Sequence, residues 1–151
     1  MTRLVLAWCL AALAFTMPAP AGENFRIGVC VMGTRHAYFR DMLDEITMNA
    51  EKAGVTVLPG DADFDHARQV AVLEGFIQEK VDLIMVAPYD ARQLVPTLEH
   101  AGAAGIPVIS LDSPIGGYPC ISHCGSDNAA GGRLAAGMML EHLGERELSG
   151  G

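Results

Sequence analysis

The chain has 151 residues, of which 50% are hydrophobic and 19% charged, and this composition fits one globular domain with a core rather than a disordered segment. Its formal net charge of -8 leaves no basic surface to neutralise phosphates, which argues against a nucleic-acid partner. We therefore expect the partners to be small molecules or proteins.

The first 21 residues have the three parts of a secretory signal peptide. Arg3 precedes an apolar stretch over residues 4–15, and Ala19 and Ala21 are spaced as a cleavage site of the A-x-A type. The alternative, a retained membrane anchor, is disfavoured because the apolar stretch is shorter than the roughly 20 residues needed to span a bilayer. We expect residues 1–21 to be removed and residues 22–151 to form one exported, periplasmic domain.

Three cysteines, Cys30, Cys120 and Cys124, follow the predicted cleavage site, so at least one thiol stays unpaired within a monomer. Cys120 and Cys124 lie in a segment with extended character, where four residues separate them by roughly 13 Å, beyond disulfide reach. Zinc binding by these two with His123 is a weaker interpretation, because the spacing matches no strong zinc pattern. We expect no metal site here, and we expect the cysteines to be small apolar side chains in a core.

Apolar runs alternate with segments of helical spacing from residue 25 onward. Four strands and a weaker fifth are predicted at residues 25–32, 55–61, 81–88, 106–112 and 120–127. In the segments between them, apolar residues recur every three or four positions, which is typical of helices. These positions are Met42, Ile46 and Ala53; Val70, Leu73, Phe76 and Ile77; and Leu94, Leu98 and Ala101, with a fourth helix over about 129–143.

This alternation predicts the fold class. Nearly continuous apolar strands indicate burial on both faces of a sheet, which is typical of parallel sheets covered by helices. The sequence therefore predicts an α/β fold, a three-layer doubly wound parallel sheet.

In such sheets, ligands bind beyond the carboxyl ends of the strands, so the segments that follow each strand are the informative ones. They contain no P-loop, no dinucleotide-binding glycine motif and no nucleophile elbow, and we expect no cofactor. Asp61, Asp63 and Asp65 alternate as in a calcium loop but lack its glycine and its terminal glutamate. We interpret them as a loop, with Asp65 as the N-cap of the second helix.

The order of these elements resembles the N-terminal lobe of the type I periplasmic binding proteins, in particular the ribose-binding-like group of sugar ABC transporters. The resemblance covers residues 25–144. It depends on the paired aromatics Tyr38 and Phe39 after the first strand and on three further stretches, at residues 81–101, 105–113 and 121–143. It implies a Rossmann-like lobe. Members of the family have two lobes with the ligand between them, and this chain has the length of one.

The resemblance also implies ligand-binding roles. Phe39, together with Tyr38, would stack on the apolar face of a sugar ring, and His36 occupies a position where the family often has a polar ligand contact. Asp112, at a strand end, would accept hydrogen bonds from ligand hydroxyls. Ser113 is included in the same set, although many sugar-binding members have an arginine at that position.

Four further residues complete the expected site. Ser126 and Asn128, in the turn before the fourth helix, are candidate ligand contacts, and Asp90 would support the site from behind. Arg35 is the candidate for the cation that Ser113 does not provide. We expect no catalytic residue.

Other interpretations of these residues remain open. Tyr38 and Phe39 also suit a core position at a helix start, and His36 also suits a solvated loop. Asp112 could serve only to accept hydrogen bonds from neighbouring backbone N–H groups. Asp127 and Asn128 are both good helix N-caps, whatever the function.

The resemblance implies the periplasmic solute-binding component of a sugar-type ABC importer, which binds a sugar or polyol, works with a membrane permease and is not an enzyme. A single lobe offers one wall of the cleft, so we expect weak binding and self-association through the surface left exposed. One alternative is an exported sensory module that partners a membrane receptor or kinase. Another is an exported enzyme that uses His36 and Asp112 as an acid–base pair, for which no nucleophile is evident.

Overall fold

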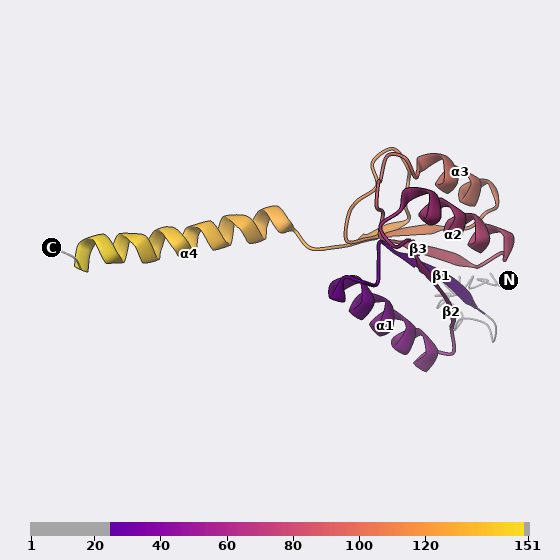
Figure 1. Ribbon diagram of the computed structural model, residues 1–151, viewed down its shortest axis with the longest axis horizontal. Coiled ribbons are helices and arrows are strands. Elements are labelled where there is room, and N and C mark those ends of the chain that lie inside the picture. The colour runs from indigo at the N-terminus through magenta and orange to yellow at the C-terminus, as the bar shows by residue number, and fades with distance from the viewer. Residues whose placement is uncertain (1–24, 150–151) are drawn as a thin grey trace, which may run out of the picture.

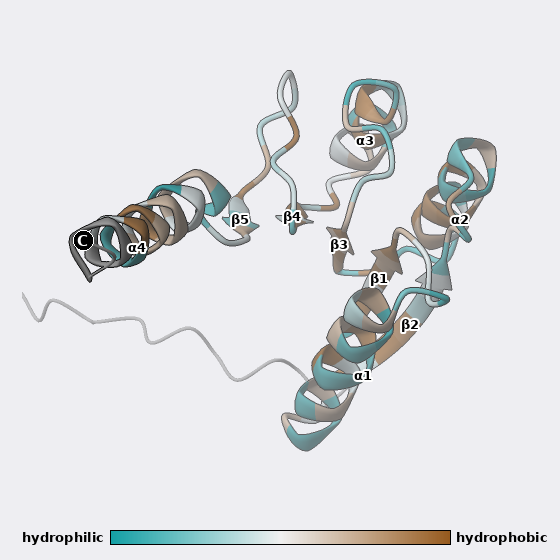
Figure 2. Ribbon diagram, turned by 60° about the vertical axis from the view of Figure 1, so that its left-hand side comes forward, coloured by the Kyte–Doolittle hydropathy of each residue, from teal (hydrophilic) through white to brown (hydrophobic). Residues whose placement is uncertain are grey.

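The computed structural model describes residues 25–149, so the predicted signal peptide lies outside the described residues. Five parallel strands form one sheet in the order β2-β1-β3-β4-β5, and Figure 2 shows them side by side in this order. Their bounds are β1 Arg26–Val31, β2 Thr56–Asp61, β3 Leu83–Val86, β4 Val108–Leu111 and β5 Ser122–Cys124. All five predicted strands are confirmed.

Four helices follow the strands within the described part of the chain. They are α1 Ala37–Lys52, α2 His66–Gln78, α3 Val95–Ala103 and α4 Asn128–Ser149. α1 covers one face of the sheet, and α2 and α3 lie together on the other (Figure 1). This arrangement confirms the predicted α/β fold with a doubly wound parallel sheet.

The larger core lies between the sheet and the pair α2 and α3. Leu73 and Phe76 from α2 meet Leu98 from α3 above the buried side chains of β3 and β4. Phe76 packs directly on Gly28 of β1, where a Cβ atom would lie 2.5 Å from its ring. The glycine thus lets α2 approach the centre of the sheet.

The smaller core lies under α1. Val29 and Val31 of β1 pack with Phe39, the buried residue of α1, and Met85 and Ile109 of β3 and β4 are only partly buried beside them. α1 contacts β1 and β2, so the part of this face formed by β4 and β5 has no helix on it within the described residues. The sheet is therefore covered on one face and half covered on the other.

α4 differs from the other helices because it projects away from the sheet instead of packing on it (Figure 1). Almost all side chains from Asn128 to Gly144 are exposed, including every large apolar one. The expectation of a sheet wrapped by all its helices was therefore wrong for α4. Among the described residues, no helix is long and apolar enough to cross a membrane.

Polar side chains cap three of the helices at their first turns. Asp65 accepts a hydrogen bond from the N–H of Arg68 at 2.6 Å, which confirms it as the N-cap of α2. Asp127 accepts from the N–H of Ala130 at 2.8 Å before α4. His36 caps α1 through Nδ1, a role that was not predicted for it.

Cys30, Cys120 and Cys124 form no disulfide in the structure, and they differ widely in accessibility. Burial raises the pKa of Cys30 to about 12, an effect that the hydrogen bond from Gln69 only partly opposes. Since the thiolate is the reactive form, we expect iodoacetamide at mildly alkaline pH to modify the exposed Cys124 in the native protein and to spare Cys30. Mass spectrometry of the alkylated peptides checks this. Equal modification of both thiols before unfolding would contradict it, and the urea-unfolded chain is the control.

Candidate functional site

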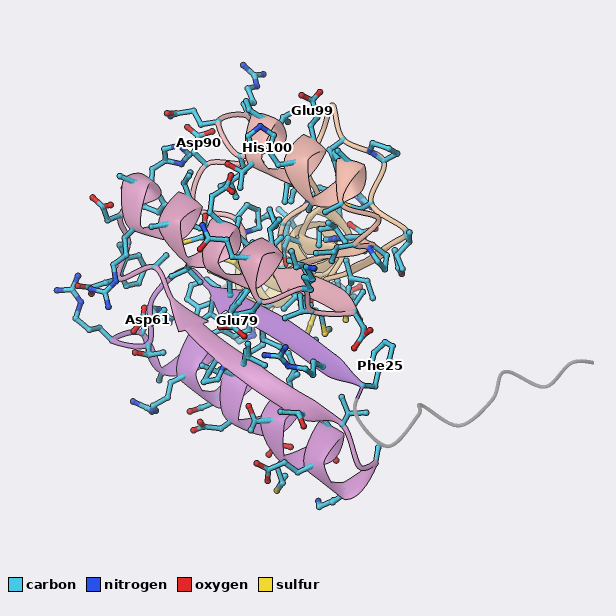
Figure 3. All side chains as sticks on the ribbon, turned by 90° about the vertical axis from the view of Figure 1, so that its right-hand side faces the viewer. Phe25, Asp61, Glu79, Asp90, Glu99 and His100 are labelled. Atoms are coloured by element: carbon cyan, nitrogen blue, oxygen red, sulfur yellow. The ribbon has the colours of Figure 1, made fainter. Side chains whose placement is uncertain are left out.

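The candidate site lies at the carboxyl ends of the strands. The chain order reverses between β1 and β3, since β2 lies on one side of β1 and the later strands on the other. In doubly wound sheets, ligands bind beyond the strand ends at this point. Figure 3 shows the two ends of the sheet, with Asp61 and Asp90 on one side of the view and Phe25, just before β1, on the other.

Asp112 is the best-defined polar group at this end. Its Oδ1 accepts a hydrogen bond from the Tyr38 hydroxyl at 3.1 Å, and its Oδ2 accepts one from the Ser113 hydroxyl at 3.1 Å. These partners are side-chain hydroxyls, not the backbone N–H groups considered above. The backbone of Asp112 is in the left-handed region, with φ of 61°, and its N–H donates to the carbonyl of Cys124 at 2.8 Å. The end of β4 thus holds the carboxylate in a defined direction.

Tyr38 remains a hydrogen-bond donor to this carboxylate. Partial burial raises the pKa of the Tyr38 hydroxyl, and the hydrogen bond to Asp112 and the charge of Asp112 raise it further. The hydroxyl is therefore protonated at neutral pH. Asp112 and Tyr38 are 74 residues apart in the chain, and this hydrogen bond joins the end of β4 to the start of α1.

The aromatic side chains after β1 divide into a buried ring and an exposed one. Phe39 is only 8% exposed and belongs to the core under α1, whereas Tyr38 is 48% exposed. The two rings meet edge to face with centroids 5.1 Å apart, and Phe39 is likewise in edge contact with Phe64 and His36. In this structure Tyr38 is the ring available to a ligand, and Phe39 supports it from below.

His36 and Arg35 are engaged with their own surroundings. The His36 Nδ1 accepts a hydrogen bond from the N–H of Tyr38, and no described hydrogen bond joins it to Asp112. Arg35 forms an ion pair with Asp63 at 2.7 Å and lies over the ring of Phe64. The candidate cation is therefore paired beside β2 and not with Asp112.

Asp61 and Thr34 connect the ends of β1 and β2. Both the hydroxyl and the N–H of Thr34 donate to the Asp61 carboxylate, which also accepts from the N–H of Asp63. Burial alone would raise the pKa of Asp61, but these hydrogen bonds outweigh it, so the pKa lies below its ordinary value. The alternating aspartates predict a loop at Asp61 but not its pairing with Thr34.

The loop after β3 contains Asp90 and Tyr89, of which only Asp90 was among the predicted site residues. Asp90 accepts from the backbone N–H groups of Arg92 and Gln93 and from the Gln93 amide, and the N–H of Gln93 is the main cause of its lowered pKa. Asp90 therefore stabilises the turn in which it lies. Tyr89 is exposed, and its backbone N–H donates at 2.8 Å to the buried Gln69, which holds the loop in place.

An apolar groove of about 380 Å³ lies beside Tyr38, on the part of the sheet that α1 leaves open. It is lined by Tyr38, Met42, Ile46, Met85, Leu111, Cys124, Gly125 and Ser126. Ser126 is thus brought close to Tyr38, and Asn128 begins α4 two residues later, with its N–H on the carbonyl of Ser126. A larger groove, of about 560 Å³, lies between β2 and α2 and shares no residue with this region.

The model of the periplasmic binding protein domain matches residues 27–151. The ribose import binding protein of Bacillus subtilis is 29% identical over 144 residues, which cover 94% of this chain and 47% of that protein. The chain thus spans about half the length of the curated relatives it matches.

Two solved structures are also similar. An ABC transporter solute-binding protein of Agrobacterium vitis, bound with α-D-tagatopyranose, is 35% identical over 74% of this chain and 41% of its own, with a TM-score of 0.66. The fructose-binding periplasmic domain of a hybrid two-component system is 32% identical over 79% of this chain and 40% of its own, with a TM-score of 0.71. The match over residues 27–151 shows that this chain belongs to the periplasmic binding protein family, and its doubly wound sheet agrees with this.

Proposed function

We propose that this chain is a ligand-binding lobe of a solute-binding protein that serves a sugar-type ABC importer, and that its ligand is a sugar or polyol. The observation that supports this most directly is the carboxylate of Asp112 at a strand end, held by two hydroxyls beside the exposed ring of Tyr38. A carboxylate accepts hydrogen bonds from vicinal hydroxyls, and an aromatic face suits the C–H groups of a sugar ring.

The relatives support the class of ligand, because those compared above bind ribose, tagatose and fructose by name. Ser113, Ser126 and Asn128 are the further polar groups that we assign to the ligand wall, with His36 and Phe39 behind Tyr38. We assign no catalytic step to any of them. The protein is exported to the periplasm by its first 21 residues, and its macromolecular partner is the permease.

Asp112→Asn tests the proposal. The amide keeps the shape of the carboxylate and tolerates the left-handed backbone, but it offers one acceptor oxygen fewer and no charge. We expect its dissociation constant for the bound sugar to rise at least about tenfold, as for loss of a hydrogen bond to a charged group. Calorimetric titration with pentoses, hexoses and polyols at millimolar concentration measures this, and thermal unfolding without ligand checks the fold.

Asp44→Asn is the matched control, since Asp44 is exposed on α1 and belongs to no part of the site. Its affinity is expected to equal that of the unsubstituted chain. A wild-type chain that binds no member of the panel, or an Asp112→Asn chain that binds as tightly as the control, would refute the proposal.

A second function is favoured by one observation, the similarity to the periplasmic domain of a two-component system. In that case the same lobe would bind its sugar and report to a membrane receptor. Co-purification from the native membrane separates the two, because a permease and a receptor kinase are distinct partners.

A further inference from the structure

Both oxygens of the Asp112 carboxylate accept a hydrogen bond from a hydroxyl of the chain itself. The Tyr38 hydroxyl donates to Oδ1 and the Ser113 hydroxyl donates to Oδ2, each at 3.1 Å. Hydrogen bonds from a hydroxyl to a carboxylate are ordinarily about 2.5–2.7 Å long, so both of these bonds are long for their kind. A ligand hydroxyl that approaches Asp112 at the ordinary distance therefore forms the stronger bond.

The carboxylate of Asp112 does not need Tyr38 to hold its position. The backbone of Asp112 has φ of 61°, a left-handed conformation that is costly for a residue with a side chain and is enriched at functional sites. The N–H of Asp112 donates to the carbonyl of Cys124 at 2.8 Å, and the N–H of Ser113 donates to the carbonyl of Leu111 at 2.6 Å. The main chain thus fixes the direction of the carboxylate, and its hydroxyl partner can be exchanged.

The Tyr38 hydroxyl is able to leave Asp112 without disturbing α1. The start of the helix is held by other contacts, since the N–H of Tyr38 donates to the His36 Nδ1 and the next residue, Phe39, packs in the core. The Tyr38 side chain is 48% exposed and meets the ring of Phe39 only edge to face. Because water replaces Asp112 as the partner of an exposed hydroxyl, release of this bond leaves no polar group of Tyr38 unpaired.

We propose that the Tyr38 hydroxyl substitutes for a ligand hydroxyl at Oδ1 of Asp112, an inference that rests on the proposed function, and that a sugar displaces it on binding. The affinity for a fully hydroxylated sugar is then lowered, because one hydrogen bond breaks for each one that forms. Selectivity against deoxy sugars is lowered too, because Tyr38 keeps its bond when the ligand has no hydroxyl to offer Asp112. Tyr38 is thus a specificity-determining residue that broadens the range of sugars bound.

Tyr38→Phe is the first test, because it keeps the aromatic ring and removes only the hydroxyl. The probes for calorimetric titration are ribose, fructose and tagatose, the sugars named for the relatives, together with their singly deoxygenated analogues. We expect the dissociation constant for the tightest-binding sugar to fall about fivefold, as for one net hydrogen bond. We expect the largest ratio of dissociation constants between a deoxy analogue and its parent sugar to rise at least about fivefold, because Asp112 is then left without a partner.

Tyr118→Phe is the matched control for this test. The Tyr118 hydroxyl lies beside α3, where a Cβ atom at Gly102 would be 3.0 Å from it, so its removal is expected to leave both quantities unchanged. A Tyr38→Phe chain that binds the sugar equally or more weakly would overturn this inference alone, since the hydroxyl would then support binding. A wild-type chain that binds none of the three sugars or their analogues would refute the proposed function and this inference with it.

The second test measures the hydrogen bond between Tyr38 and Asp112 without any sugar. The chain has three tyrosines, so a background with Tyr89→Phe and Tyr118→Phe leaves Tyr38 as the only one. After partial burial, the hydrogen bond to Asp112 and the charge of Asp112 are the main causes that raise the pKa of the Tyr38 hydroxyl. Asp112→Asn in this background is therefore expected to lower that pKa, which the ultraviolet absorbance of the phenolate follows during alkaline titration. An unchanged pKa would show that the two groups are not bonded in solution, and would overturn the inference.

Discussion

Gln69→Leu is expected to reduce the free energy of unfolding by about 2–4 kcal/mol, because it removes the hydrogen bonds of a fully buried amide to two backbone groups. The Gln69 Nε2 donates to the carbonyl of Ala87 at 2.9 Å, and its Oε1 accepts from the N–H of Tyr89 at 2.8 Å. Leucine fits the space but leaves these two backbone groups without a partner. Urea unfolding followed by circular dichroism measures the difference.

Gln78→Leu is the matched control, since Gln78 is the exposed last residue of the same helix. Its effect is expected to stay within about 0.5 kcal/mol, as for most surface substitutions. If both variants unfold at the same urea concentration, Gln69 does not hold the loop after β3. Because that loop contains Tyr89 and Asp90, the same variant also shows whether the loop contributes to ligand affinity.

Gly28→Ala is expected to destabilise the fold by about 3 kcal/mol through overpacking. The added Cβ atom would lie 2.5, 2.6 and 2.9 Å from three ring atoms of Phe76, and the centre of β1 has no room to move away. Denaturant unfolding of Gly28→Ala, Phe76→Leu and the double variant measures the coupling. We expect the smaller side chain to relieve at least about 1 kcal/mol of the cost of alanine.

Gly75→Ala provides the comparison on the same helix. A Cβ atom there meets nothing within 4 Å, so alanine only improves the helix and is expected to stabilise it by up to about 1 kcal/mol. Equal effects of alanine at positions 28 and 75 would contradict the close packing of Phe76 on β1.

The sequence predicts those parts of the fold that depend on local pattern. Strand positions, helix spacing and the cap at Asp65 follow from residues within one or two turns of each other, and the structure has them all. The detachment of α4 could not be predicted, because periodicity and capping define a helix but do not specify what it packs against. Composition was nevertheless a signal, since α4 has few charged side chains and four glycines.

The same distinction applies to the site. A carboxylate at the end of a strand can be placed from the sequence, and Asp112 lies there. Its hydrogen bond to Tyr38 spans 74 residues and depends on how α1 meets β4, which no local pattern contains. Arg35 is the opposite case. Its position in the loop after β1 predicted that it could pair with Asp112, but in the structure its ion-pair partner is Asp63. The ligand-binding roles themselves remain predictions.

Tyr38 belongs to two surfaces, since its hydroxyl contacts Asp112 and its ring lines the apolar groove. A ligand hydroxyl that takes the place of the Tyr38 hydroxyl at Asp112 would therefore also alter one wall of the groove, so the shape of the groove would be a second readout of binding at Asp112.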